Sequence, residues 1–230
     1  MIEHTVSAFD RELELLGRKI SEMGGIAEKM LSESIEALIN LKVEDAQAII
    51  ATDSRLDTLQ REIEEEAVHI IARRQPLGAD LREIIGAMRI SGDLERVGDL
   101  AKNIAKRTLK LANDQRLPRA MIGLRHMGQL AAMQLKEVLD AYGQGDVNRA
   151  DHVWHRDAEI DALEDSVFRE LLTFMMEDPR NISSCTHLLF CSKNVERAGD
   201  HATNIAETVH YIVTGEKLPV DRPKIAQNSL

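Results

Sequence analysis

The chain has 230 residues, of which 39 are acidic and 29 are basic, so its net charge is −10 with histidine taken as neutral. Because no basic face dominates, this balance argues against nucleic acid as the main partner. Aromatic residues are scarce, and Leu, Ile, Ala and charged residues are abundant, which is typical of long helices. No apolar run approaches the roughly 18 residues of a membrane span, and we find no signal-peptide pattern, so we expect an intracellular protein without a transmembrane segment.

Apolar residues recur at intervals of three and four along most of the chain, which predicts long amphipathic helices. Pro76 ends one such stretch, and Gly24-Gly25 interrupts the first one and is expected to bend it. Asp178, which precedes a proline, is expected to cap the start of the last helix. The six predicted helices cover residues 8–41, 45–74, 79–112, 119–141, 146–176 and 179–213.

The segment Leu94–Lys106 returns 101 residues later as Val195–Glu207, with eight of thirteen positions identical. So many identical residues at a single offset predict an internal repeat. We therefore expect an all-α fold of two pseudo-symmetric three-helix bundles, with one continuous bundle as the alternative. The predicted domains are residues 1–115 and 116–216, followed by a flexible C-terminal tail at residues 217–230.

Each repeat carries a column of oxygen donors on one side of a helix. In the third and sixth helices, two carboxylates and an amide stand at i, i+4 and i+8, roughly one turn apart. The second and fifth helices each add an i, i+4 pair of aspartates, which would face the column if the helices are antiparallel neighbours. The first repeat contributes Asp53, Asp57, Glu95, Asp99 and Asn103, and the second contributes Asp157, Asp161, Glu196, Asp200 and Asn204.

Four carboxylates gathered in one place repel one another by roughly a few kcal/mol for each close pair. Basic neighbours (Arg96, Lys102 and Arg197) or bound cations can compensate this charge. All-oxygen ligation suits Mg²⁺, Ca²⁺ and Mn²⁺, and carboxylate-rich sites also hold iron. The spacing alone leaves open both a metal site and an ion-paired surface between helices. Gly98 and Gly199 recur within the column, which predicts that something approaches the helix closely there.

The residues NVERAGDHATNIAE, preceded by DPRNISSCTHLLF, and their first-repeat counterpart DLERVGDLAKNIA resemble the motifs of the PhoU family of phosphate-specific transport system accessory proteins. The resemblance covers about residues 8–215. It implies a cytoplasmic, often dimeric protein that is a negative regulator of phosphate-starvation signalling and restrains phosphate uptake. It also implies two partners, the ATPase subunit of a phosphate ABC transporter and a phosphate sensor histidine kinase, which would hold the protein peripherally at the inner membrane.

Family members hold multinuclear metal clusters at these acidic motifs, so the resemblance implies metal ions (Mg, Mn, Zn or Fe) at the ten column and pair residues named above. Two of the differences between the copies change the chemistry beside the columns. Position 201 is His in the second copy and Leu100 in the first, and Asp93 precedes the first motif where Asn194 precedes the second. We therefore expect the two sites to differ.

Three other readings compete with this one. Glu66-x-x-His69 and Glu207-x-x-His210 match the signature of a ferritin-like di-iron protein, although they fall in different halves of the chain. A metal-dependent hydrolase would need a positioned nucleophile or a phosphate-cradling loop, and we identify neither, so we expect no enzyme. The third alternative is a helical adaptor protein that binds no metal. The two cysteines at 185 and 191 have no CxxC spacing and are expected to be buried thiols on one helix.

Overall fold

The structure is a computed structural model that describes residues 2–112 and 121–219. Over these residues the fold is all-α, with seven α-helices, one short 3-10 turn and no strand, which confirms the predicted fold class. The elements are α1 (Ile2–Asn40), α2 (Val43–Arg74), α3 (Gly78–Leu111), α4 (Met121–Gln144), α5 (Val147–His155), α6 (Asp157–Glu177), η1 (Pro179–Asn181) and α7 (Ile182–Thr214).

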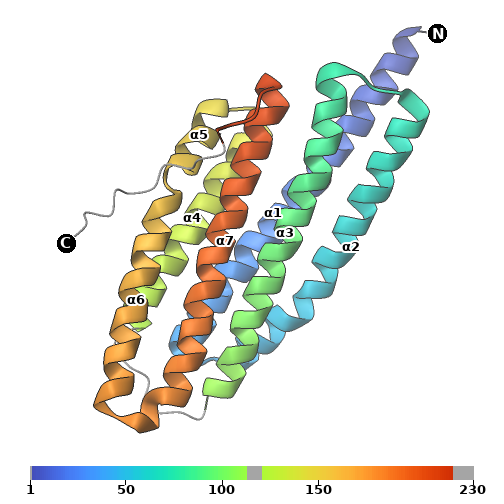
Figure 1. Cartoon of the computed structure of the whole chain (residues 1–230). Coiled ribbons are helices and arrows are strands. Elements are labelled where there is room, and N and C mark those ends of the chain that lie inside the picture. Colours follow the sequence, from blue (N-terminus) through green and yellow to red (C-terminus); the bar gives the residue numbers. More distant parts are fainter. Residues whose placement is uncertain (1, 113–120, 220–230) are drawn as a thin grey trace.

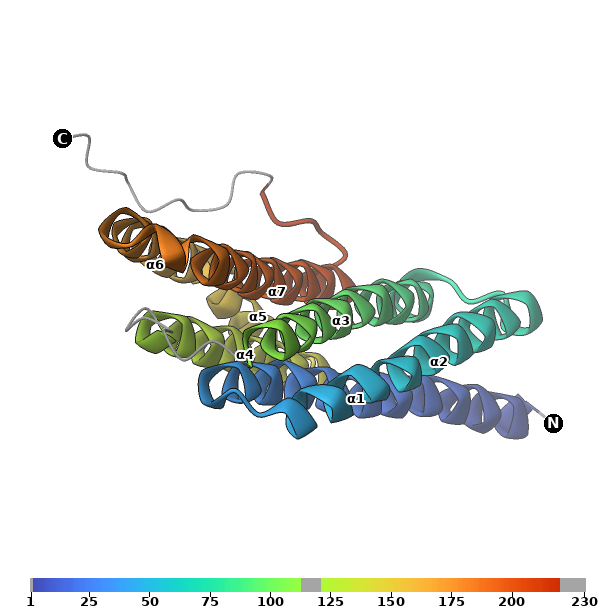
Figure 2. The same cartoon turned by 90° about the horizontal axis from the view of Figure 1, so that it is seen from below.

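The helices form two three-helix bundles, α1–α3 and α4–α7, in which α5 and α6 together take the place of one helix (Figure 1). The bundles meet along their length, because α3 packs on α7 and α1 packs on α4. The outer helices α2 and α6 therefore lie on opposite sides of four central helices (Figure 2). The buried apolar residues make one continuous core, so two repeats share a single hydrophobic interior.

Most helix boundaries lie within three residues of the predicted ones. The first helix is continuous as predicted, since α1 runs unbroken through Gly24-Gly25, and a bend there stays a prediction. A Cβ atom at Gly24 would clash with Leu139 of α4, so this glycine serves the contact between the two bundles. At the start of the last helix, the Asp178 carboxylate accepts from the backbone N–H of Arg180 at 2.9 Å, as predicted for a cap, although the turn it caps is η1.

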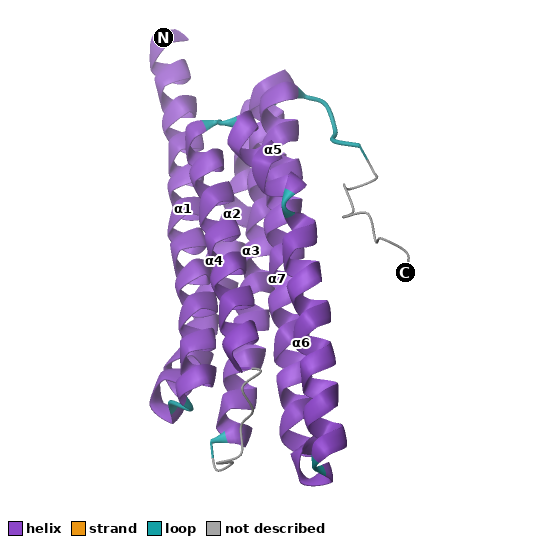
Figure 3. Ribbon diagram, turned by 90° about the vertical axis from the view of Figure 1, so that its left-hand side faces the viewer, coloured by secondary structure: helices purple, strands orange, loops and turns teal. Residues whose placement is uncertain are grey.

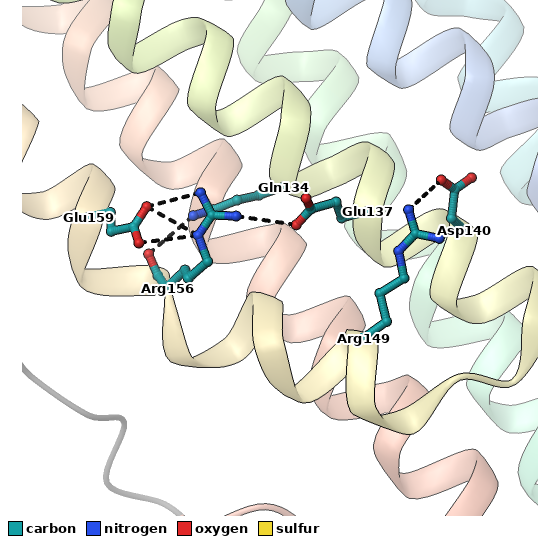
Figure 4. A network of polar contacts seen from close by, with 6 residues as sticks. All are labelled: Gln134, Glu137, Asp140, Arg149, Arg156 and Glu159. Atoms are coloured by element: carbon teal, nitrogen blue, oxygen red, sulfur yellow. Dashed lines mark hydrogen bonds and ion pairs between the residues drawn. The ribbon is translucent and has the colours of Figure 1, made fainter.

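The fifth predicted helix is wrong in one respect, because the structure breaks it at Arg156 into α5 and α6. The backbone carbonyl of Arg156 accepts a hydrogen bond from the buried amide of Gln134 on α4 at 3.1 Å. Its guanidinium group binds Glu159 at 3.1 Å and Glu137 at 3.4 Å. Figure 4 shows this network, in which a side chain from α4 satisfies a carbonyl at the break. The break makes Asp157 the first residue of α6.

The axes of the long helices are roughly aligned with one another (Figure 3). No helix in the described part of the chain is long and apolar enough to cross a membrane. Cys185 and Cys191 are both buried on α7, as expected. The predicted border between the domains at residues 115 and 116, and residues 220–230 of the predicted tail, lie outside the described residues.

Candidate functional site

The two repeated glycines bring a pair of helices together in each bundle. A Cβ atom at Gly98 of α3 would clash with the side chain of Leu56 of α2, and one at Gly199 of α7 would clash with Ile160 of α6. Leu56 and Ile160 are both buried and are 104 residues apart, which is the offset between the aspartate pairs. The predicted close approach is therefore confirmed, and it sets the aspartate pairs of the outer helices beside the acidic columns.

We call Asp53, Asp57, Glu95 and Asp99 the first cluster and Asp157, Asp161, Glu196 and Asp200 the second cluster. In the first cluster, Lys102 of α3 places its ammonium group between two carboxylates. Its Nζ atom lies 2.6 Å from Asp53 Oδ2 on α2 and 2.5 Å from Asp99 Oδ1. Burial alone lowers the pKa of Lys102, but these two hydrogen bonds outweigh it and raise the pKa above its usual value. The first cluster therefore contains its own cation.

Glu95 of the same cluster is also largely buried, and its only ion pair within the described residues is with an exposed arginine. Burial raises the pKa of Glu95, and the nearby carboxylates of Asp99 and Asp57 add to the rise, while Arg96 opposes it. Arg96 Nε lies 3.5 Å from Glu95, but the arginine is largely exposed, so solvent weakens this pair. Asp57 of α2 is itself exposed, but its carboxylate lies near enough to Glu95 of α3 to contribute to this rise in pKa.

The second cluster has the same acids and different partners. Thr203, the counterpart of Lys102, places its hydroxyl 2.9 Å from Asp157 Oδ1. Lys193 reaches Glu196 Oε1 at 2.7 Å from an exposed position on α7. The other oxygen, Glu196 Oε2, is buried and has no hydrogen-bond partner among residues 2–112 and 121–219. A buried carboxylate oxygen without a donor is unfavourable, so this cluster is less well compensated than the first.

Shifts of pKa in the second cluster have the same origin. Asp161 is exposed, but partial loss of solvent around its carboxyl group still raises its pKa, and the charges of Asp157 and Glu196 raise it further. Burial likewise raises the pKa of Glu164, which the sequence analysis did not single out, and Lys193 opposes that rise. The first-repeat counterpart of Glu164 is Gln60, which is neutral. The second cluster thus has a fifth acid at its edge.

The trailing amides differ between the repeats. Asn103 is exposed, whereas Asn204 donates from Nδ2 to Asp93 Oδ1 across the bundle interface at 3.3 Å. His201 Nδ1 lies 2.9 Å from the same carboxylate oxygen of Asp93. Asp93 and His201 each stand where the other sequence copy has a different residue, and the structure brings them together. Sequence reasoning found both positions but could not pair them, because the contact joins α3 to α7.

The residues present fit a hard cation by their donor chemistry, since each cluster offers only carboxylate oxygens. As the side chains stand, no group of three or more His, Cys, Asp or Glu residues in the described ranges converges on one point to hold a metal ion. A cation would thus need these side chains to rearrange. The orphaned Glu196 oxygen favours such a fit in the second cluster, and Lys102 opposes it in the first. Whether metal binds there stays a prediction.

The di-iron reading does not agree with the structure. Its two signatures lie on α2 and α7, and these helices do not contact each other over the described residues. Glu207 accepts a hydrogen bond from Trp154 Nε1 at 3.2 Å, and His210 Nδ1 lies 2.7 Å from Asp151. Both residues of the second signature thus bind α5, while His69 of the first is exposed.

Two three-helix repeats, each with a carboxylate cluster between its second and third helices, define a class of tandem helical repeat protein. The family model described as the PhoU domain matches this chain twice, at residues 20–108 and 124–209, one match for each bundle. The chain belongs to the PhoU family.

Relatives match over nearly the whole chain. A Rhizobium meliloti (strain 1021) protein named phosphate-specific transport system accessory protein PhoU homolog is 55% identical over 96% of this chain and 93% of that protein. A Caulobacter vibrioides protein of the same name is 50% identical over 98% of each chain. The crystal structure of PhoU from Pseudomonas aeruginosa superposes with a TM-score of 0.88 at 39% identity, covering 90% of this chain and 100% of that one.

Proposed function

We propose that this chain is an accessory protein of a phosphate transport system that acts as a negative regulator of phosphate-starvation signalling and phosphate uptake. The observation that carries the proposal is the similarity to proteins named phosphate-specific transport system accessory protein, which extends over 96% of the chain at 55% identity. Both repeats are matched, so the similarity includes both carboxylate clusters. The proposal makes the chain a regulator rather than an enzyme.

In this proposal the chain is a cytoplasmic adaptor. It links the ATPase subunit of the phosphate ABC transporter to a phosphate sensor histidine kinase and reaches the inner membrane through these partners. Two outer helices, α2 and α6, leave long faces on opposite sides of the molecule, which suits a protein that contacts two partners (Figure 2). We also propose that it acts as a homodimer.

We further propose that the carboxylate clusters are cation sites for Mg, Mn, Zn or Fe ions. The support is that acids of the outer and inner helices lie near enough in each repeat to affect one another's pKa, together with the buried oxygen of Glu196 that has no hydrogen-bond partner in the described residues. A bound ion would offset part of the negative charge of a cluster and join the outer helix to the helix behind it. The residues that would hold ions are those of the first and second clusters, with the amides of Asn103 and Asn204 beside them.

The regulatory proposal is tested with a phosphate-starvation reporter in a strain that lacks the gene for this chain. We expect the reporter to be active in phosphate-rich medium in the deletion strain and silent again when the full chain is supplied. The control is the deletion strain that carries the empty expression plasmid, in which the reporter should stay active. Unchanged repression in the deletion strain would contradict the proposal.

A further inference from the structure

The two bundles leave a cleft between them, toward the end of the molecule at which α3 begins and α7 ends (Figure 1). Helices α1 and α3 of the first bundle and α4 and α7 of the second form its walls. Its volume of about 680 Å³ lies within the range of small-molecule sites, which is about 300–1,000 Å³. None of the residues that line it belongs to either carboxylate cluster.

The space in this cleft exists because small residues stand at its walls. A Cβ atom added at Gly17 of α1 or at Gly143 of α4 would have no atom within 4 Å. These glycines therefore differ from Gly98 and Gly199, each of which receives a side chain of the neighbouring helix. The wall opposite is apolar and consists of side chains from the last turns of α7 and from α1, which are Val209, Ile212 and Leu13.

Two polar side chains, Glu83 of α3 and Tyr142 of α4, lie together in the wall and are both partly buried. Burial raises the pKa of each, and the charge of Glu83 raises the pKa of Tyr142 further. Neither side chain makes a hydrogen bond or an ion pair with any residue of 2–112 and 121–219. A partly buried carboxylate without a donor is unfavourable, so a donor that enters the cleft would gain from meeting Glu83.

The charges of the cleft favour a cation over an anion. Its described lining contains three carboxylates and one guanidinium group, and three of these four charges lie at the exposed rim, on Asp10, Glu14 and Arg18. The fourth is Glu83, which is the carboxylate nearest to the apolar wall and to the aromatic ring of Tyr142. A cation beside Glu83 could therefore also contact that ring, an arrangement that favours organic ammonium ions.

We propose that this cleft binds a small organic ammonium ion with an apolar chain: the nitrogen donates to the carboxylate of Glu83, and the chain packs on Val209, Ile212 and Leu13. This site goes beyond the proposed function and depends neither on the regulatory role nor on metal at the clusters. The ligand would contact both bundles at once. Its binding would thus stabilise the arrangement in which the two bundles pack together.

The probe for a test is hexylammonium, which combines one positive charge with an alkyl chain. Three related compounds separate its features: methylammonium has the charge without the chain, hexanol has the chain without the charge, and hexanoate has the chain with the opposite charge. Binding to the full-length chain is measured by isothermal titration calorimetry. A salt concentration of about 0.15 M screens attraction between the probe and the acidic surface as a whole.

Two variants address the charge and the space of the site separately. Glu83→Gln removes the carboxylate, and Glu33→Gln, at an exposed position of α1 outside the cleft, is its control. Gly17→Leu fills the cleft and keeps every charge. Gly92→Leu is its control, because an added Cβ there also has no atom within 4 Å and the position does not line the cleft.

We expect the wild-type chain to bind hexylammonium with a dissociation constant below about 1 mM and to bind the three other compounds more weakly. Glu83→Gln should weaken binding of hexylammonium by about tenfold, since it removes a charge-assisted hydrogen bond. Gly17→Leu should abolish binding, and it should also raise the midpoint of thermal unfolding, because leucine favours a helix more than glycine does. Both control variants should bind hexylammonium as wild type does.

Three results would overturn the inference. The first is a wild-type chain that does not bind hexylammonium, and the second is equal binding of hexanoate or hexanol, which would make the charge of Glu83 irrelevant. The third is a Gly17→Leu chain that binds hexylammonium as wild type does, which would place the ligand elsewhere. Far-UV circular dichroism verifies that the variants are helical, and Gly17→Leu decides the matter if Glu83→Gln does not fold. The reporter experiment judges the regulatory proposal separately.

Discussion

The first and second carboxylate clusters occupy equivalent places in the two repeats and handle their negative charge differently. In the first, an internal lysine bridges the outer and inner helices. In the second, the outer helix breaks at Arg156, a threonine hydroxyl contacts Asp157, and one oxygen of Glu196 is left buried without a donor. The backbone of α6 thus begins at the cluster, and its N-terminal dipole favours the charge of Asp157.

This comparison separates what the repeat preserves from what it changes. The packing beneath the clusters is the same, with Gly98 against Leu56 and Gly199 against Ile160. The charge beside that packing differs, because Lys102 is replaced by Thr203 and Gln60 by Glu164 in the second repeat. We conclude that the repeat conserves a geometry in which acids meet, and that each copy compensates those acids by its own means.

The largest expected effect concerns the shared packing. Leu56→Ala and Ile160→Ala each remove a fully buried side chain from a helix contact, so each should lower the free energy of unfolding by about 2–5 kcal/mol. Urea denaturation followed by circular dichroism measures both losses. Val68→Ala, at an exposed position of α2, is the control and should change stability by less than about 0.5 kcal/mol. Losses that differ strongly between the two buried sites would contradict the conclusion that the two packing contacts are equivalent.

A smaller loss is expected when the close approach itself is blocked. Gly98→Val and Gly199→Val each insert a branched side chain where Leu56 or Ile160 already lies, which should cost about 1–3 kcal/mol. Gly92→Ala is the matched control on α3, because nothing lies within 4 Å of an added Cβ there. That control should stabilise the helix by about 0.5–1 kcal/mol. If Gly98→Val is as stable as wild type, the glycine has no packing role.

The charge comparison predicts unequal effects of removing a lysine. Lys102→Met leaves Asp53 and Asp99 without their shared partner inside the cluster, and we expect a loss of about 1–2 kcal/mol at neutral pH. Lys193→Met removes a largely exposed lysine from the second cluster and should cost less than about 0.5 kcal/mol. Thermal unfolding of metal-free protein at low and high salt measures both. Equal losses would show that the internal position of Lys102 does not increase its contribution to stability.

The smallest expected effect is a dependence on pH. Burial raises the pKa of Glu164 above its ordinary value of 4.5, so the folded chain binds this proton at a higher pH than the unfolded chain does. The stability that results is complete below 4.5 and is lost as the pH rises through the raised value. Glu164→Gln, which restores the first-repeat residue, should make metal-free stability less dependent on pH in that window.

The control for the pH prediction is Glu33→Gln at an exposed position of α1, which should leave the pH dependence of stability as it is in wild type. Denaturation curves at a series of pH values, with a chelator present, measure the slope in all three proteins. A slope that stays the same in Glu164→Gln would contradict the assignment of a raised pKa to this residue.

Much of the site could be predicted from the sequence, because helical periodicity is local. The i, i+4 spacing of Glu95 and Asp99 defines one side of a helix whatever lies opposite, and the 104-residue offset of Asp53 and Asp157 predicts the helices that face them. The wrong prediction of an unbroken fifth helix was also a local one. Arg156 sits within an unbroken pattern, but its carbonyl is bound by Gln134 of another helix. Gly24 likewise interrupts an apolar pattern for a reason that lies outside its own helix, which is the contact with Leu139 of α4.

The sequence by itself determined the all-α fold, the twofold repeat and the eight acids of the two clusters, since each follows from residue spacing along one helix. Only the tertiary structure decided which charges meet. It placed Lys102 between Asp53 and Asp99, and it paired Asp93 with His201 across the bundles. Such pairs depend on how helices far apart in the sequence pack together, and spacing within a single helix does not contain that information.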